Sequence, residues 1–199
     1  MKEVLSGTIK VKMEKIIKDA IVNHTFLIES IEEYISTIKT IASIFINALR
    51  QNKKIIFFGN GGSAADAQHL AAELVGRFKK TRRPMASIAL NTNSSIITAV
   101  GNDFGFENIF SSQIEALGNP EDVAVGISTS GVSENIVRGI LKAKERKLIT
   151  VVFSGKGGGK LKDIADINLI VPSYDTARIQ EVHIFIGHII CEIVENEIS

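Results

Sequence analysis

The sequence predicts an α/β fold in which a parallel sheet of five strands lies between two layers of helices. Five short apolar runs have the length and composition of buried strands, and helix-length amphipathic segments separate them. This alternation is typical of a three-layer sandwich whose parallel strands are connected by helices. The strand-like runs are residues 55–58, 85–90, 123–128, 148–154 and 167–171.

Helical periodicity fills the segments between these runs and extends towards the start of the chain. Apolar residues recur at helical spacing over about 13–31 and again over about 32–51, so two helices precede the first strand. A minimal α/β sheet needs fewer helices, and we expect their apolar faces to pack on the sheet or on another subunit. The remaining helical segments are 64–76, 94–100, 107–117, 133–146, a short turn near 160–165, and 176–195.

Length and composition favour one globular domain. At 199 residues and 45% hydrophobic content, we expect a single domain over 1–199, with N-terminal helices at about 13–51 and an α/β core at about 53–199. The formal net charge of +1 argues against a nucleic-acid-binding protein, which needs clustered cations. We interpret the one basic cluster as a solvated loop; its members are Lys79, Lys80, Arg82 and Arg83.

Cysteine usage and hydropathy indicate a cytoplasmic protein without a membrane segment. Cys191 is the only cysteine, so no intrachain disulfide is possible, and a reducing compartment is the simple expectation. The N-terminus lacks a signal-peptide pattern. The apolar run at 184–194 contains His188 and Glu192 and is too short to cross a bilayer.

A glycine-rich loop follows the first strand-like run, with the sequence Gly59-Asn60-Gly61-Gly62-Ser63. Glycine reaches positive φ at little cost, and Ser63 is a suitable N-cap for the next helix. Strand, glycine turn and helix start together offer free backbone N–H groups to an anion. The P-loop lysine and the dinucleotide glycine spacing are both missing, so we expect no nucleotide cofactor but a phosphate on a smaller molecule. The alternative is that the glycines only shape a turn.

The helix after this loop carries His69, Glu73 and Arg77 at a spacing of four residues, which places them on one face. A histidine and a glutamate at this spacing can share a metal ion or act as an acid/base pair. The plainer alternative is a solvated polar stripe. Proximity to a candidate phosphate loop favours the functional interpretation.

A second candidate loop, Ser128-Thr129-Ser130-Gly131-Val132-Ser133, follows the third strand-like run and leads into a helix. Hydroxyl groups and free N–H groups at a helix start can hold a phosphate without lysine. Loops after the first and third strands meet at the same edge of a parallel sheet, where ligands bind in such folds. The alternative is a serine-rich cap.

Two further glycine-containing segments are less distinctive. Residues 101–106 place Asn102 and Asp103 between glycines, which indicates a turn or a polar wall for sugar hydroxyls. We interpret residues 154–160 as a flexible strand-to-helix connection.

In the last helix, Gln180 and Glu181 lie about 80° and about 20° from His188 around the helix axis. Spacing alone leaves the choice between His183 and His188 open.

Together these motifs resemble the phosphoheptose isomerases of the sugar isomerase (SIS) domain family. The resemblance runs from about residue 13 to 195. It is carried by five motifs in order: Asn60-Gly61-Gly62-Ser63, His69 with Glu73, Gly101-Asn102-Asp103, Ser128-Thr129-Ser130-Gly131 with Ser133, and Arg178-Ile179-Gln180-Glu181 with His188.

The resemblance implies a flavodoxin-like parallel sheet and a cytoplasmic homotetramer with active sites between subunits. The implied reaction converts D-sedoheptulose 7-phosphate into D-glycero-D-manno-heptose 7-phosphate, the first step towards activated heptose. By this likeness Glu73 and His188 are the acid/base pair, and Gln180 contacts the substrate. The phosphate ligands are Ser128, Thr129, Ser130 and Ser133, and the sugar is lined by Asn60, Gly61, Gly62, Ser63, Asn102 and Asp103.

The resemblance also implies one zinc ion per subunit, held by His69, Glu73, Gln180 and His188. A residue cannot bind zinc and transfer a proton in the same state, so we expect substrate to displace Glu73 or His188. One position departs from the pattern: Ala177 stands where some relatives carry aspartate. A proton-transfer role for that aspartate is therefore not carried over.

Two other functions fit the same fold. One is a non-catalytic tetrameric scaffold like the DnaA initiator-associating protein, in which His69 and Glu73 would be relics. The other is a sugar-phosphate sensor, but no DNA-binding segment accompanies this domain. His188 favours the isomerase, because the binding-only relatives lack a histidine there.

Overall fold

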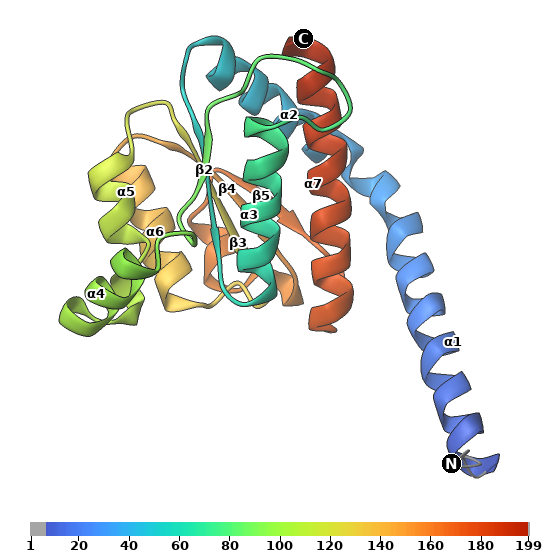
Figure 1. Cartoon of the computed structure of the whole chain (residues 1–199). Helices are drawn as coiled ribbons and strands as arrows, with labels where there is room; N and C mark the ends of the chain where they lie inside the picture. Colours follow the sequence, from blue (N-terminus) through green and yellow to red (C-terminus); the bar gives the residue numbers. More distant parts are fainter. Residues whose placement is uncertain (1–6, 199) are drawn as a thin grey trace, which may run out of the picture.

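The computed structural model describes residues 7–198, which form a twisted parallel sheet covered by helices on both faces (Figure 1). The strands lie in the order β2-β1-β3-β4-β5, and every neighbouring pair is parallel. This order confirms the predicted three-layer fold with a flavodoxin-like sheet. The strands are β1 (Ile55–Gly59), β2 (Ser87–Ala89), β3 (Val123–Ser128), β4 (Ile149–Ser154) and β5 (Ile167–Ile170).

Successive side chains of a strand point to opposite faces, so the apolar runs of the central strands β1, β3 and β4 contribute to two cores. Phe57 joins the core under α2, α3 and α7, whereas Phe58 joins the core under α5 and α6. Burial on both faces explains why the strands are continuously apolar. The helices of the first layer are α2 (Ile35–Arg50), α3 (Gly62–Val75) and α7 (Thr176–Ile198); those of the second are α4 (Ser94–Phe104), α5 (Ser111–Leu117) and α6 (Glu134–Glu145).

The N-terminal helix α1 (Gly7–Glu29) projects away from this body (Figure 1). A short 3₁₀ helix, η1 (Ser30–Tyr34), connects it to α2, whose apolar face packs on the sheet. In contrast, Ile16, Ile21 and Phe26 of α1 are 60–67% exposed. We expected the N-terminal helices to pack on the sheet or on another subunit. Helix α2 packs on the sheet, whereas α1 presents apolar side chains outward.

Helix α4 is longer than the sequence predicts. The pattern ended the helix at Val100, but the structure continues it to Phe104. Residues 101–104 are thus the last turn of α4, and the interpretation of Asn102 and Asp103 as a turn is wrong. The chain reverses at Gly105, whose φ of 91° ends the helix.

Arg82 corrects the interpretation of the basic cluster. Its side chain is only 3% exposed, and its guanidinium donates to the carbonyls of Glu73, Leu74 and Gly76 at the end of α3. It also pairs with the buried Glu195 of α7, at 3.2 Å. The carboxylate of Glu195 in turn accepts three backbone N–H bonds, of 2.8–3.0 Å, from the loop at residues 78–80. This loop is therefore tied to α3 and α7.

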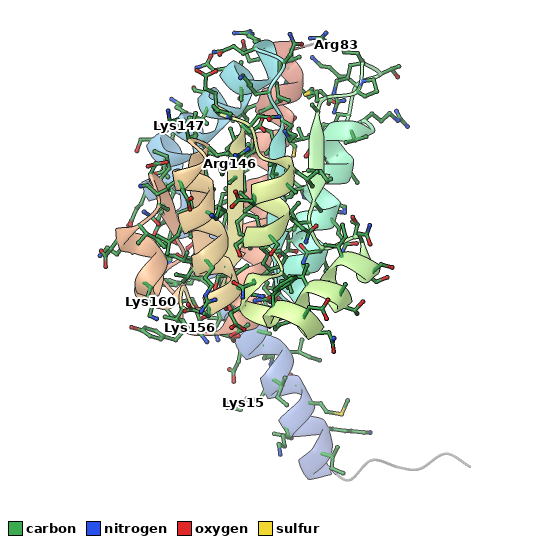
Figure 2. All side chains as sticks on the ribbon, turned by 90° about the vertical axis from the view of Figure 1, so that its left-hand side faces the viewer. Lys15, Arg83, Arg146, Lys147, Lys156 and Lys160 are labelled. Atoms are coloured by element: carbon green, nitrogen blue, oxygen red, sulfur yellow. The ribbon has the colours of Figure 1, made fainter. Side chains whose placement is uncertain are left out.

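Cations outside this network are spread over the molecule. Figure 2 shows the labelled lysines and arginines distributed from α1 to the opposite end of the body. This distribution agrees with the near-neutral net charge. Among residues 7–198, the structure contains no helix that is both long and apolar enough to span a bilayer.

We expect Glu195→Gln to lower the free energy of unfolding by about 3–5 kcal/mol, the usual cost of breaking a buried ion pair. The amide offers one acceptor oxygen where the carboxylate offers two, and it loses the charge opposite Arg82. Backbone hydrogen bonds and Arg82 hold the pKa of Glu195 below its ordinary value despite burial. Its contribution is therefore present above that ordinary value and is lost as the pH falls through the lowered pKa.

Chemical denaturation between pH 3 and 7 measures this effect, with the exposed Glu197→Gln of the same helix as the control. Equal stability of the two variants at pH 7 would contradict the assigned role of Glu195.

Candidate active site

The loop after β1 needs its glycines for two different reasons. Gly61 has a φ of 55° and is the N-cap of α3. Gly59 and Gly62 instead allow close approach. A Cβ on Gly59 would lie 2.6 Å from the carbonyl oxygen of Ser63, and one on Gly62 would lie 2.6 Å from the Gln180 side chain. The prediction that Ser63 caps the helix is wrong, because Ser63 lies inside α3 and its side chain is buried.

The serine-rich loop after β3 is ordered by its own hydroxyl groups. Ser128 is 4% exposed and donates from Oγ to Oγ of Ser133, over 3.2 Å. Gly131 takes a φ of 67° and turns the chain towards α6. Ser133 is the N-cap of α6 but makes no side-chain cap bond; its carbonyl accepts from the N–H groups of Ile136 and Val137, each over 3.0 Å, which leaves the helix start beside the serine-rich loop. Loop and helix start together suit an anion.

The glycine-rich segment at 154–160 is not a flexible connection, as the sequence indicated, but a support for the serine loop. It forms the start of the 3₁₀ helix η3 (Lys156–Asp163). The Gly155 N–H donates to the Thr129 carbonyl over 3.2 Å, and the Leu161 N–H donates to the Gly131 carbonyl over 3.1 Å. A Cβ on Gly131 would lie 2.0 Å from the Gly158 carbonyl oxygen, so only glycine fits this contact.

Both loops lie at the same edge of the sheet, as predicted. Strand β1 pairs with β3 up to Gly59 and Ile127, and the loops leave from these ends. Strand order reverses at this pair, with β2 on one side and β4 on the other. In doubly wound sheets this switch point is where ligands bind.

A second group lies where α3 packs against α7. The Nε2 atoms of His69 and His188 are 2.9 Å apart, and His69 Nε2 is 3.2 Å from Oε1 of Glu73. One donor atom from each of the three residues lies within 4.8 Å of the others. The helical spacing predicted that His69 and Glu73 share a face, and the packing of α7 adds His188.

The surroundings of His188 favour its neutral form. Phe78 stacks on the imidazole, with 5.4 Å between ring centroids. Burial lowers the pKa of His188, the neighbouring His69 lowers it further, and Glu73 opposes the shift. A neutral imidazole is the form that accepts a proton or binds a metal ion.

The structure also decides between the two histidines of α7. His183 is fully buried, and its Nε2 donates to the Ser154 carbonyl over 3.1 Å. Burial lowers its pKa to about 4. His183 is therefore a core residue, and His188 is the histidine of the site. Glu181 faces α1 instead, where it pairs with His24 at 2.7 Å, and it also pairs with Arg178 of its own helix at 2.7 Å.

The remaining predicted residues lie outside the histidine group. Gln180 packs against Gly62 and precedes His188 by eight residues, about 12 Å along the helix axis. Asn102 and Asp103 are exposed at the end of α4, and the Asn102 amide donates to Asp103 over 2.7 Å. Their contacts with a sugar, and a metal bond from Gln180, stay predictions.

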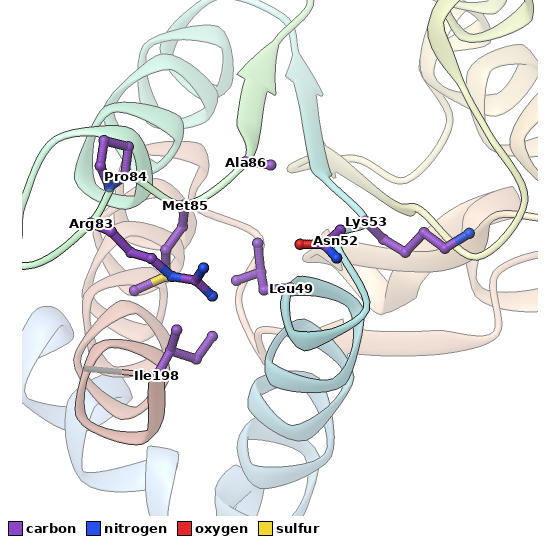
Figure 3. Close-up of a pocket in the computed structure, with 8 residues that line it drawn as sticks. All are labelled: Leu49, Asn52, Lys53, Arg83, Pro84, Met85, Ala86 and Ile198. Atoms are coloured by element: carbon purple, nitrogen blue, oxygen red, sulfur yellow. The ribbon is translucent and has the colours of Figure 1, made fainter.

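A cavity of about 150 Å³ lies at the opposite edge of the sheet, where β1 and β2 begin (Figure 3). Arg83 reaches into it between Leu49 and Ile198, and Lys53 points away. Since parallel α/β sheets bind ligands at the carboxyl ends of their strands, this cavity is on the wrong side for the candidate site.

The donor set of the histidine group fits zinc. Two imidazole nitrogens and a carboxylate oxygen are the usual ligands of catalytic zinc, which keeps a further position open. The observed separations allow all three atoms to converge on one ion after small side-chain rotations. Glu73 and His188, the predicted acid and base, are two of the three.

Comparisons with known proteins agree with this geometry. Residues 22–155 match the family model of the SIS domain. The chain is 58% identical to the phosphoheptose isomerase of Aquifex aeolicus over 83% of this chain and 86% of that protein. It is 47% identical to the phosphoheptose isomerase of Clostridium acetobutylicum over 100% of this chain and 96% of that protein. The structure of phosphoheptose isomerase from Neisseria gonorrhoeae superimposes with a TM-score of 0.88 at 37% identity, covering 92% of this chain and 99% of that one.

The match to the SIS domain model covers two thirds of the chain and identifies the class as a sugar isomerase domain. Within that class, the identities to its relatives show that the chain belongs to the phosphoheptose isomerase family. The predicted family resemblance is confirmed.

Sequence reasoning missed three residues that surround the site. Asn135 is 3% exposed and pairs with Asn60, and Phe78 stacks on His188. Asp66 precedes His69 by three residues on α3; burial raises its pKa to about 6, and His69 opposes the shift. Asn135 could have been found from the sequence, because it is a polar residue just inside a helix start. Nothing near Phe78 in the sequence indicates that it contacts α7.

We expect the protein to bind a single zinc ion per chain, and His188→Ala to lower the affinity by more than roughly tenfold, because even an outer-shell partner contributes that much. Elemental analysis after dialysis and competition with a chromophoric chelator measure this loss. His24→Ala removes a histidine outside the group and serves as the control. Equal zinc affinity of the two variants would rule out His188 as a ligand.

Proposed function

We propose that the protein interconverts D-sedoheptulose 7-phosphate and D-glycero-D-manno-heptose 7-phosphate, an aldose–ketose isomerisation that begins the synthesis of activated heptose. Family membership supports this activity. The single observation that carries the chemistry is the meeting of His69, Glu73 and His188 between α3 and α7. A phosphate loop at the switch point of the same sheet matches the substrate class.

The proposed chemistry uses two groups for two kinds of proton. The reaction moves a proton between C1 and C2 through an enediol, so one group takes the proton from carbon and another serves the oxygens. Glu73 is the proposed carbon base: it takes the proton from one carbon, can exchange it with solvent while the enediol is present, and delivers a proton to the neighbouring carbon. His188, kept neutral by its lowered pKa, accepts and returns the proton on oxygen.

Zinc on His69, Glu73 and His188 would polarise the substrate carbonyl as a Lewis acid. Glu73 and His188 must each be free of the metal while they transfer a proton, because the same lone pair cannot serve both purposes. Gln180 lies beside the glycine loop, about 12 Å from His188 along the axis of α7, so we propose it as a substrate contact and, as a fourth ligand, only to the ion of a neighbouring copy. The phosphate is proposed to bind to Ser128, Thr129, Ser130 and Ser133, and the sugar to Asn60, Gly61, Gly62, Ser63, Asn102 and Asp103.

A catalytic role explains the histidine group better than a scaffold does. A scaffold or sensor needs the sugar-phosphate loops but has no use for two imidazoles and a carboxylate in contact. Phe78 stacks on the His188 ring, and burial lowers the pKa of His188. A histidine that served only as a polar surface residue would need neither feature.

We propose further that the protein acts in the cytoplasm as a homotetramer. Ile16, Ile21 and Phe26 on the projecting α1 are 60–67% exposed, and a second copy would remove them from water at roughly 25 cal/mol per Å². Gly62 and Glu73 lie about 16 Å apart along the axis of α3. One substrate has to contact both the glycine loop and Glu73. This separation therefore favours active sites in which these two groups come from neighbouring copies.

The direct test is incubation of the purified protein with sedoheptulose 7-phosphate in D₂O, followed by NMR. We expect an aldoheptose phosphate to form with solvent deuterium on carbon. Glu73→Gln keeps the shape of the side chain but removes the basic oxygen, and it should slow turnover by roughly 10²–10⁴-fold and abolish the exchange.

Glu115→Gln, on the opposite helical layer, is the matched control and should retain the wild-type rate. An inactive wild-type protein would contradict the proposed function. Normal deuterium exchange by Glu73→Gln would assign the carbon base to another residue.

We expect Phe26→Glu to reduce the molar mass measured by light scattering from that of a tetramer to that of smaller assemblies. A carboxylate at this position cannot be buried in an apolar contact without a partner. Lys12→Glu introduces the same charge on the same helix at an exposed polar position and should leave the mass unchanged. A tetrameric Phe26→Glu variant would show that α1 does not carry the assembly contact.

A further inference from the structure

Two asparagine side chains join the two ligand loops of the switch point. The Asn60 amide donates from Nδ2 to Oδ1 of Asn135 over 2.8 Å, and the Asn135 amide donates from Nδ2 to Oδ1 of Asn60 over the same distance. Asn60 belongs to the glycine loop after β1, and Asn135 lies in the first turn of α6, just after the serine loop. The paired amides therefore cross from one loop to the other.

A third hydrogen bond fixes the direction of this pair. The backbone N–H of Ile136 donates to Oδ1 of Asn135 over 2.9 Å, so that atom must be the oxygen. The Asn135 oxygen then faces the Asn60 nitrogen, and the Asn135 nitrogen faces the Asn60 oxygen. The backbone of α6 thus determines, through Asn135, which way the Asn60 amide points.

The burial of the pair makes this constraint strong. Asn135 is 3% exposed, whereas Asn60 is only partly buried. Reversing the Asn60 amide would bring two oxygens and two nitrogens face to face, and the buried Asn135 amide would lose bonds that water cannot replace. Asn60 keeps one N–H and one lone pair outside the pair, and these can meet a hydroxyl or carbonyl oxygen of a ligand.

We infer that Asn135 is a positioning residue for the isomerisation: it holds the Asn60 amide in one orientation and keeps the sugar loop in register with the phosphate loop. It acts through Asn60 and does not itself contact the substrate. This inference rests on the proposed function, because it assigns Asn60 to the sugar and residues 128–133 to the phosphate.

A double-mutant cycle tests the inference, with Asn60→Ala, Asn135→Ala and the double variant compared in kcat/KM for sedoheptulose 7-phosphate. Loss of one buried partner should lower kcat/KM by roughly tenfold to a hundredfold. If Asn135 acts through Asn60, its removal in the Asn60→Ala background should cost less than roughly twofold. Equal losses in both backgrounds, or no loss in either, would overturn the inference.

Asn135→Asp separates positioning from folding. Its carboxylate can still accept from the Ile136 N–H, and a negative charge is tolerated at the start of α6. It nevertheless presents an oxygen to the Asn60 oxygen, so kcat/KM should fall while the variant, although its buried charge lowers the melting temperature, is still folded at the assay temperature. Lys142→Ala, two turns further along α6, is the control and should change neither quantity. Wild-type kcat/KM in Asn135→Asp would contradict the assigned orientation.

An NMR measurement on the protein without substrate tests the amide pair independently of the proposed function. The buried Asn135 side-chain NH₂ signal in NMR spectra, identified by its loss in Asn135→Ala, should be protected from exchange with water in the wild type. It should lose that protection in Asn60→Ala. Rapid exchange in the wild type would refute the amide pair even if the enzyme is active, and a wild type inactive on sedoheptulose 7-phosphate would refute only the proposed function.

Discussion

The packing of α3 against α7 is the contact on which the candidate site depends. The two helices run in the same direction, since Gly62 meets Gln180 at one end and Leu70 meets Gly187 further along. At Gly187 a Cβ would lie 2.6 Å from the Leu70 side chain, so the missing side chain sets how closely the helices approach. That approach brings the Nε2 atoms of His69 and His188 to 2.9 Å. Arg82 and Glu195 secure the far end of the same pair of helices.

The sheet supplies the second constraint, because it sets where the ligand loops start. The parallel pairing of β1 with β3 brings two loops together that are about 70 residues apart in sequence. Three kinds of contact then hold them: the register of the strands, the paired amides of Asn60 and Asn135, and the glycine segment packed on Gly131. Anion binding by backbone N–H groups needs such rigidity, because each N–H must already point at the phosphate.

Local patterns were sufficient to predict the sheet, the two loops at its carboxyl edge and the shared face of His69 and Glu73, since these depend on periodicity and on turn chemistry. They could not predict contacts between distant elements. His183 and His188 were indistinguishable by spacing, and only the position of β4 beside α7 makes His183 a core residue. Ser63 satisfied the composition of an N-cap, but the φ of Gly61 moved the helix start by two residues. Arg82 looked like surface charge because its partner, Glu195, is more than a hundred residues away.

The measurement that tests the α3–α7 contact most directly is kcat for Gly187→Leu, a substitution that replaces no predicted ligand, acid or base. The larger side chain should push the helices apart by about an ångström and lower kcat by roughly a hundredfold, since misplacement of this size has that effect. The circular dichroism spectrum and KM should stay close to those of the wild type, because the substitution leaves the sheet and the serine-rich loop at residues 128–133 unchanged. A wild-type kcat in a folded Gly187→Leu protein would contradict the claim that this contact assembles the site.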